Sequence, residues 1–193
     1  MMNSTGESKA LFKTKMIANL VIYQIVWLAC ILSAARGIPG LGILAALIAV
    51  VWHVSQAQRP LAEFQLILLT GLIGGLWDSL LVIVGLIQYP SGSLMPWMAP
   101  IWIITLWMAF ATTFNLGLRW LHGHYGLAAI FGMIGGPLAW WAGHALGALT
   151  LLNPLVSLAV LGLGWAALMP VLMRLAVYLD QLPHETTDLN WEH

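Results

Sequence analysis

Charged side chains are scarce in this sequence. Lysine, arginine, aspartate and glutamate together make up 7% of its 193 residues, whereas soluble globular domains carry roughly 25%. Hydrophobic residues make up 61%, and the mean hydropathy is +0.89. This balance excludes an ordinary soluble domain and indicates an integral membrane protein. The formal net charge is zero, and no cluster of basic residues is dense enough to predict nucleic acid as a partner.

Cysteine is almost missing. Cys30 is the only one, and it lies in an apolar run, so an intrachain disulfide and a CxxC metal or redox site are both excluded. His122 and His124 lie close together in a polar break, but two loop histidines without carboxylate or cysteine support are a weak metal signal. We therefore expect neither a metal site nor another cofactor.

Long apolar runs are what the sequence has in abundance. A helix needs about 20 residues to cross a hydrocarbon core of about 30 Å, and six stretches reach or approach that length. Short breaks rich in proline, glycine and polar residues separate them. The predicted spans are residues 16–35, 38–55, 62–87, 98–118, 125–149 and 154–179. We expect an all-α polytopic membrane protein, with residues 16–179 forming one compact bundle of six transmembrane helices.

The basic residues predict how the bundle is oriented. Lysine and arginine are favoured on the cytoplasmic side of a membrane. With the N-terminus inside, the three lysines of the N-terminal segment and three of the four arginines fall at the inner side, and only Arg36 falls outside. Both termini are therefore expected in the cytoplasm. Residues 1–15 would be a cytoplasmic N-terminal segment, and residues 180–193 an acidic cytoplasmic tail.

An aspartate interrupts the third apolar run. Asp78 and its neighbour Ser79 are predicted about 6 Å beyond the membrane midplane, where an ionised carboxylate costs roughly 2.5–3.5 kcal/mol on insertion scales. His144 of the fifth run is predicted in the same half of the membrane. We expect Asp78 and His144 to pair inside the bundle, because charged residues in membranes face the interior. Alternatively, Asp78 accepts hydrogen bonds from indole or hydroxyl groups or stays protonated, and His144 only packs.

A second set of polar residues is predicted near the inner boundary: Asn19, His53, Glu63, Asn115 and Arg119. Glu63 begins the third run and Arg119 ends the fourth, so an ion pair between them is one interpretation. The favoured interpretation is that these charges extend to the lipid headgroups and anchor the helix ends.

The fifth run combines small residues with a proline. Gly135, Ala139, Gly143 and Gly147 recur every four residues, which predicts a smooth face for close helix packing. Pro137 lies near the predicted midplane and removes a hydrogen bond from the helix. A kink or partial break is therefore expected there, and broken helices at that depth often border binding sites.

Tryptophan is used heavily, with eleven copies. Several of them, including Trp77, Trp102 and Trp140, fall within predicted spans near Asp78 and His144. They indicate either an aromatic pocket for an apolar or lipid-like ligand or ordinary packing in a bundle.

Three motifs together resemble a known family. They are LWDSLL in the third run, PWMAPIWIITLWMAFATTFNLGLRWL in the fourth and FGMIGGPLAWWAGHALGA in the fifth. The combination resembles the bacterial DUF2878 family of small inner-membrane proteins, whose activity is unknown. Genes of that family often lie beside genes for cyclopropane-fatty-acyl-phospholipid-synthase-like enzymes and flavin oxidoreductases. The resemblance thus implies a bacterial inner-membrane location and a role near envelope lipid modification, without supplying catalytic residues.

Three classes of function are weighed. The favoured one is a non-catalytic module that binds a membrane lipid or apolar ligand, or docks a membrane-associated lipid-modifying enzyme or a second copy of the chain. The alternative is a small proton-coupled transporter that uses the Asp78/His144 pair. An intramembrane lipid enzyme is less favoured, because the sequence lacks Gly-x-Ser-x-Gly, His-Glu-x-x-His and clustered aspartates. The candidate ligand-binding or polar-core residues are Asp78, Ser79, His144, Trp77, Trp102, Trp140, Asn115 and Arg119.

Overall fold

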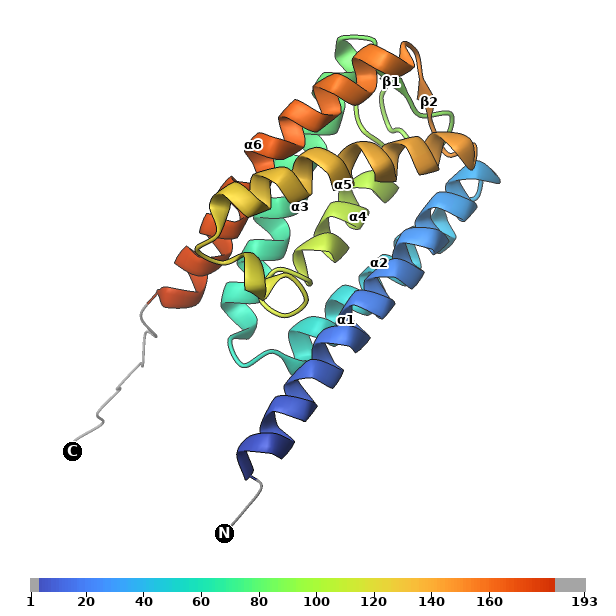
Figure 1. Cartoon of the computed structure of the whole chain (residues 1–193). Helices are drawn as coiled ribbons and strands as arrows, with labels where there is room; N and C mark the ends of the chain where they lie inside the picture. The colour runs from blue at the N-terminus through green and yellow to red at the C-terminus, as the bar shows by residue number, and fades with distance from the viewer. Residues whose placement is uncertain (1–3, 183–193) are drawn as a thin grey trace, which may run out of the picture.

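A computed structural model of the chain describes residues 4–182, and in that range the chain is almost entirely helical, as the sequence predicts (Figure 1). The elements are α1 (Ser4–Ala35), α2 (Gly40–Gln56), α3 (Pro60–Ile83), β1 (Ile87–Gln88), α4 (Ile101–Ala111), the 3₁₀ turn η1 (Arg119–Leu121), α5 (Tyr125–Ala145), β2 (Thr150–Leu151) and α6 (Pro154–Gln181). The two short strands pair antiparallel. Most of the predicted acidic tail lies outside the described residues.

Four helices are long and apolar enough to cross a membrane. They are α1 over Ala10–Ala35, α3, α5 and α6. α2 has 17 residues and α4 only 11, so each is shorter than the roughly 20 residues a full span needs. The helices thus support insertion into a membrane, while crossing by α2 and α4 and the cytoplasmic location of the termini stay predictions.

α4 lies between two helix pairs (Figure 1). α1 packs along α2 on one side and α5 along α6 on the other, while α4 also packs against α3. α1 begins and α6 ends at the same end of the bundle, which we call the terminal end. β1 and β2 lie at the opposite end, which we call the strand end.

The fourth helix ends earlier than the sequence predicts. α4 stops at Ala111, and the chain continues through residues 112–118 in mostly buried turns. The hydroxyls of Thr112 and Thr113 each donate at 2.7 Å to the backbone carbonyl three residues before. Threonine disfavours helix interiors because its hydroxyl competes for backbone groups in this way. The hydrophobic pattern of the fourth run therefore predicts correctly that the run is mostly buried. It predicts a longer helix than the structure has.

The fifth helix is continuous where a break is expected. α5 runs without interruption from Tyr125 to Ala145, with Pro137 inside it. The Pro137 ring lies close to Gly162 of α6. The predicted partial break is therefore wrong, and any site beside Pro137 must be formed by side chains on an intact helix.

Three tryptophan side chains pack directly against helix glycines. A Cβ atom at any of these glycines would collide with the indole ring, so glycine is what lets each ring approach its neighbouring helix. The pairs are Trp107 with Gly74, Trp165 with Gly136, and Trp77 with Gly164. Indole side chains therefore fill much of the space between α3, α4, α5 and α6.

Candidate functional site

Asp78 is fully buried in α3, and each of its carboxylate oxygens accepts a short hydrogen bond. The Tyr89 hydroxyl donates to Oδ1 at 2.7 Å, and the Trp107 indole donates to Oδ2 at 2.7 Å. Trp140 in turn donates to the Tyr89 hydroxyl oxygen at 3.3 Å. Hydrogen bonds to a charged group stabilise by about 1.5–3 kcal/mol each, so two of them offset the cost of placing the carboxylate there. We call these four residues the Asp78 cluster.

Asp78 and His144 do not pair. The Nδ1 atom of His144 lies 3.2 Å from the carbonyl oxygen of Leu149, just beyond the end of α5. A carbonyl only accepts, so this nitrogen donates. Because Tyr89 and Trp107 already occupy both oxygens of Asp78, the predicted pair is wrong and the alternative of indole and hydroxyl donors is correct. The transporter hypothesis loses the titratable pair on which it depended.

Two members of the cluster, Tyr89 and Trp107, are missing from the candidate residues predicted from the sequence, and Tyr89 is the harder of the two to foresee. It lies in the loop between β1 and α4, a segment that the sequence marks only as a break. Burial raises the pKa of Tyr89 well above its ordinary value, and the charge of Asp78 raises it further, so the hydroxyl keeps its proton and donates. The only sequence signal for Tyr89 is its position, because this tyrosine follows closely after a predicted span that has an aspartate in its interior.

The other predicted residues of this region separate into different roles. Ser79 accepts a hydrogen bond from the Ala99 backbone N–H at 3.0 Å and so fixes the entry to α4. Trp102 is fully buried and donates to the Ser91 carbonyl at 3.2 Å. Trp77 packs on α6 instead, and its buried indole N–H has no acceptor within residues 4–182. Of the three predicted tryptophans, Trp140 alone reaches the Asp78 cluster by a hydrogen bond.

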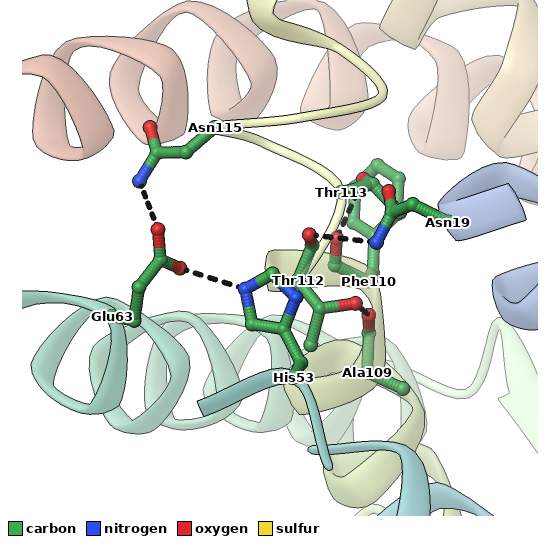
Figure 2. Close-up of polar contacts among 8 residues, drawn as sticks. All are labelled: Asn19, His53, Glu63, Ala109, Phe110, Thr112, Thr113 and Asn115. Atoms are coloured by element: carbon green, nitrogen blue, oxygen red, sulfur yellow. Dashed lines mark hydrogen bonds and ion pairs between the residues drawn. The ribbon is translucent and has the colours of Figure 1, made fainter. Parts of the chain in front are cut away.

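Glu63 is the centre of a second polar network, at the terminal end (Figure 2). Its Oε2 atom lies 3.1 Å from Nε2 of His53 at the end of α2, and its Oε1 accepts from the Asn115 amide at 2.8 Å. Arg119 is exposed and makes no ion pair with Glu63 in the described part of the chain. The ion pair considered between Glu63 and Arg119 is therefore wrong. The favoured interpretation is also wrong for Glu63, which is buried and bonded inside the bundle instead of extending to the headgroups. We call Glu63, His53 and Asn115 the Glu63 network.

The same non-helical segment is also held from α1. The Asn19 amide donates to the Thr112 carbonyl at 3.1 Å (Figure 2), so residues 112–118 are tied to α1 at one point and to α3 at another. Four of the five polar residues predicted near the inner boundary thus do lie in one region. Residues 4–182 contain no group of three or more His, Cys, Asp or Glu side chains that could hold a metal ion.

A groove of about 350 Å³ lies between α1 and α5. Its floor is formed by Phe110 of α4 and Trp165 of α6. The two helices diverge from the strand end toward the terminal end (Figure 1). The residues that line the groove come mainly from these two helices. Its remaining lining residues are Tyr23, Gln24 and Trp27 of α1 and Phe131, Gly132, Gly135, Gly136, Leu138, Ala139 and Ala142 of α5.

The small residues of α5 are divided between two neighbours. A Cβ at Gly143 would touch α1, and a Cβ at Gly136 would collide with Trp165, so close packing occurs at these positions. A Cβ at Gly135 would meet nothing within 4 Å, and Gly135 and Ala139 line the groove. The predicted packing face is therefore only partly used for packing, and the rest of it forms one wall of the groove.

The groove continues into a narrower space beside the Asp78 cluster. That space holds about 30 Å³ and is lined by Trp107 and Trp140 together with residues of the groove. The rings of Trp107 and Trp165 are stacked with their centroids 4.6 Å apart. Because the Trp107 indole also donates to Asp78, the buried carboxylate fixes the aromatic floor of the groove without reaching the groove itself.

Comparison with known proteins gives one match. The family model described as "Protein of unknown function (DUF2878)" matches residues 16–171, a range that includes the Asp78 cluster, the Glu63 network and all residues of the groove. No curated protein matches the chain. No solved structure matches it either.

Proposed function

The chain belongs to the DUF2878 family, whose function is not established, and from this premise we propose that it holds one lipid-like molecule in the groove between α1 and α5. The observation that carries the proposal is the groove itself, an apolar and aromatic concavity of about 350 Å³. Small-molecule sites usually measure about 300–1,000 Å³ and are lined by hydrophobic and aromatic side chains with few polar groups.

The lining of the groove favours a slender apolar molecule. Aromatic and small side chains make up most of the groove, and no charged side chain lines it. Its rim residues Phe131 and Leu138 are exposed on α5, a helix long enough to span, so the groove would open sideways into hydrocarbon. A slender apolar molecule from the bilayer is the occupant that fits this opening.

The proposal agrees with the role near envelope lipid modification that the family resemblance implies. A membrane-associated lipid-modifying enzyme would be the partner that receives or supplies the molecule. In this proposal the protein binds and presents its ligand.

Filling the groove tests the proposal. A Cβ at Gly135 would meet nothing within 4 Å, so Gly135→Leu directs a side chain into the groove without a collision at its base. We expect wild-type protein purified in mild detergent to retain about one lipid-like molecule, and Gly135→Leu to lose it, as counted by mass spectrometry of extracted lipids. The matched control is Gly126→Leu on the same helix, which also meets open space but lies outside the groove.

Two outcomes bear on the interpretation of that experiment. Equal retention by wild type, Gly135→Leu and Gly126→Leu would contradict the proposal. A general loss of folding is checked by the unfolding midpoint, which should be nearly the same for all three proteins. Gly136→Leu, in contrast, collides with Trp165 and is expected to lower stability by about 1–3 kcal/mol, as overpacked positions do.

A further inference from the structure

Gln24 is a polar side chain in the middle of an apolar helix. It lines the groove, is exposed, and forms no side-chain hydrogen bond with any residue between 4 and 182. Along the apolar stretch Ala10–Ala35 of α1, Gln24 lies within about 3 Å of the midpoint. Polar groups at that depth in a membrane normally find a partner, because hydrocarbon offers none. Gln24 therefore lacks a partner among residues 4–182, and a molecule in the groove would supply one.

Other hydrogen-bond donors surround the same space. Tyr23 precedes Gln24 and lines the groove, and its hydroxyl has no acceptor among the described residues. Trp165 at the floor has a buried indole N–H that also lacks an acceptor within the described range. An amide, a hydroxyl and an indole beside one another can all donate. The complementary ligand is one that carries hydrogen-bond acceptors at mid-membrane depth.

Building on the proposed function, we propose that the ligand is an alkylated quinone, a planar ring with carbonyl acceptors and an apolar tail. The ring carbonyls accept from Gln24 and Tyr23, and the tail lies along the small residues of α5. No Asp, Glu, Lys or Arg lines the groove, which suits a neutral head. The aromatic residues Trp27, Phe110 and Trp165 suit a flat ring, because aromatic groups pair in stacked or edge-to-face arrangements.

The obvious competitors fit the observations less well. The ester and phosphate groups of a phospholipid lie at the membrane interface, about 15 Å from the midplane of a 30 Å core, so its chains present no acceptor to Gln24. A simple hydrocarbon chain leaves the same amide unsatisfied. A second copy of the chain that presented an apolar helix face would also offer Gln24 no acceptor, because the carbonyls of a helix are used within it.

Binding of a defined quinone by the full chain in detergent tests the inference. Decylubiquinone is titrated against the protein, and quenching of the intrinsic tryptophan fluorescence is followed. We expect saturable quenching by wild type and about tenfold weaker binding by Gln24→Leu, the effect of losing one hydrogen bond. Tyr23→Phe should weaken binding several-fold. The matched control is Gln65→Leu, which removes an exposed glutamine of α3 outside the groove and should bind like wild type.

Two measurements, the lipid retained by the purified protein and the binding of quinone, distinguish the proposed function from the quinone inference. If Gly135→Leu loses retained lipid but wild type shows no saturable quinone quenching, the groove holds lipid and the quinone class is overturned. Quinone binding that Gln24→Leu and Tyr23→Phe leave unchanged overturns it as well. If Gly135→Leu affects neither measurement, the groove holds no ligand and both proposals fall. Only loss of quinone binding in Gly135→Leu together with weakening in Gln24→Leu supports the inference.

Discussion

Each oxygen of a buried carboxylate needs at least one hydrogen-bond donor. The Asp78 cluster supplies one donor to each oxygen of Asp78. Tyr89 comes from a loop and Trp107 from α4, so Asp78 of α3 connects three parts of the chain at one point. Trp140 extends the connection to α5. The aspartate is thus explained by packing, and its effect on the groove is indirect, through the position of the Trp107 ring.

The first prediction concerns Asp78→Asn. An amide presents one acceptor oxygen and one NH₂ group, so either Tyr89 or Trp107 loses its acceptor. Leaving such a donor unsatisfied costs about 1–3 kcal/mol. We expect the free energy of unfolding, measured by titrating mixed micelles with a denaturing detergent, to fall by about that amount.

Double-mutant cycles identify the partners of Asp78. Asp78→Asn and Tyr89→Phe should be non-additive, by about 0.5 kcal/mol or more, because the residues are in contact. Asp78→Asn and His144→Gln should be additive, because His144 bonds to Leu149 instead. Coupling to His144 in place of Tyr89 would show that the described geometry is wrong.

Among elements, α4 departs most from an ordinary transmembrane helix. It is short and central, and it is followed by turns whose peptide groups are buried. Asn19 holds the beginning of that segment, and the Glu63 network holds it further along. The polar residues near the terminal end therefore replace some of the hydrogen bonds that a continuing helix would have made.

The second prediction concerns Glu63→Leu. Removing the carboxylate leaves the Asn115 amide and His53 without their acceptor. Local opening of residues 112–118 should become easier, and amide hydrogen exchange there should rise roughly five- to tenfold, as expected when about one hydrogen bond is lost. Arg119→Gln is the control and should leave exchange unchanged. No rise in Glu63→Leu would contradict the network, and rises of similar size in Glu63→Leu and Arg119→Gln would restore the ion pair considered from the sequence.

The sequence predicts the helices well and their interruptions poorly. Apolar runs locate all six helices, because burial in a bundle or bilayer demands them. The end of α4 depends on Thr112 and Thr113 capping their own helix, and α5 continues through Pro137 while packed closely against α6. Both are decided by particular contacts, which hydrophobicity does not encode.

The candidate site is likewise only partly predictable from the sequence. Asp78 is recognisable from the sequence because an acid in an apolar run is rare, whereas Tyr89 is not, because its partner lies eleven positions away across a turn. Gln24 passes unnoticed for a different reason. Its importance comes from facing a groove, which requires the relative placement of α1 and α5.

At the scale of the whole molecule, the two ends of the bundle should lie on opposite sides of the membrane. The third prediction uses single cysteines at two exposed serines, Ser55 in the last turn of α2 and Ser93 in the loop between β1 and α4. Cys30 is buried and can stay in place. Because basic residues favour the cytoplasm, a membrane-impermeant maleimide should label Ser93→Cys in intact cells and Ser55→Cys only after permeabilisation.

The opposite labelling pattern would reverse the orientation, and labelling of both positions in intact cells would show that the bundle does not separate its ends across the membrane. Unmutated protein, which retains Cys30, is the control for background reaction.

The brevity of α4 has a consequence for how the protein is made. An 11-residue helix followed by turns has too few internally satisfied peptide groups to enter lipid alone. During synthesis this segment must therefore stay beside the earlier helices. It reaches its final position only after α5 and α6 have been made and pack around it. A ribosome that stops before Pro154 would therefore leave behind a nascent product that quality-control proteases should recognise.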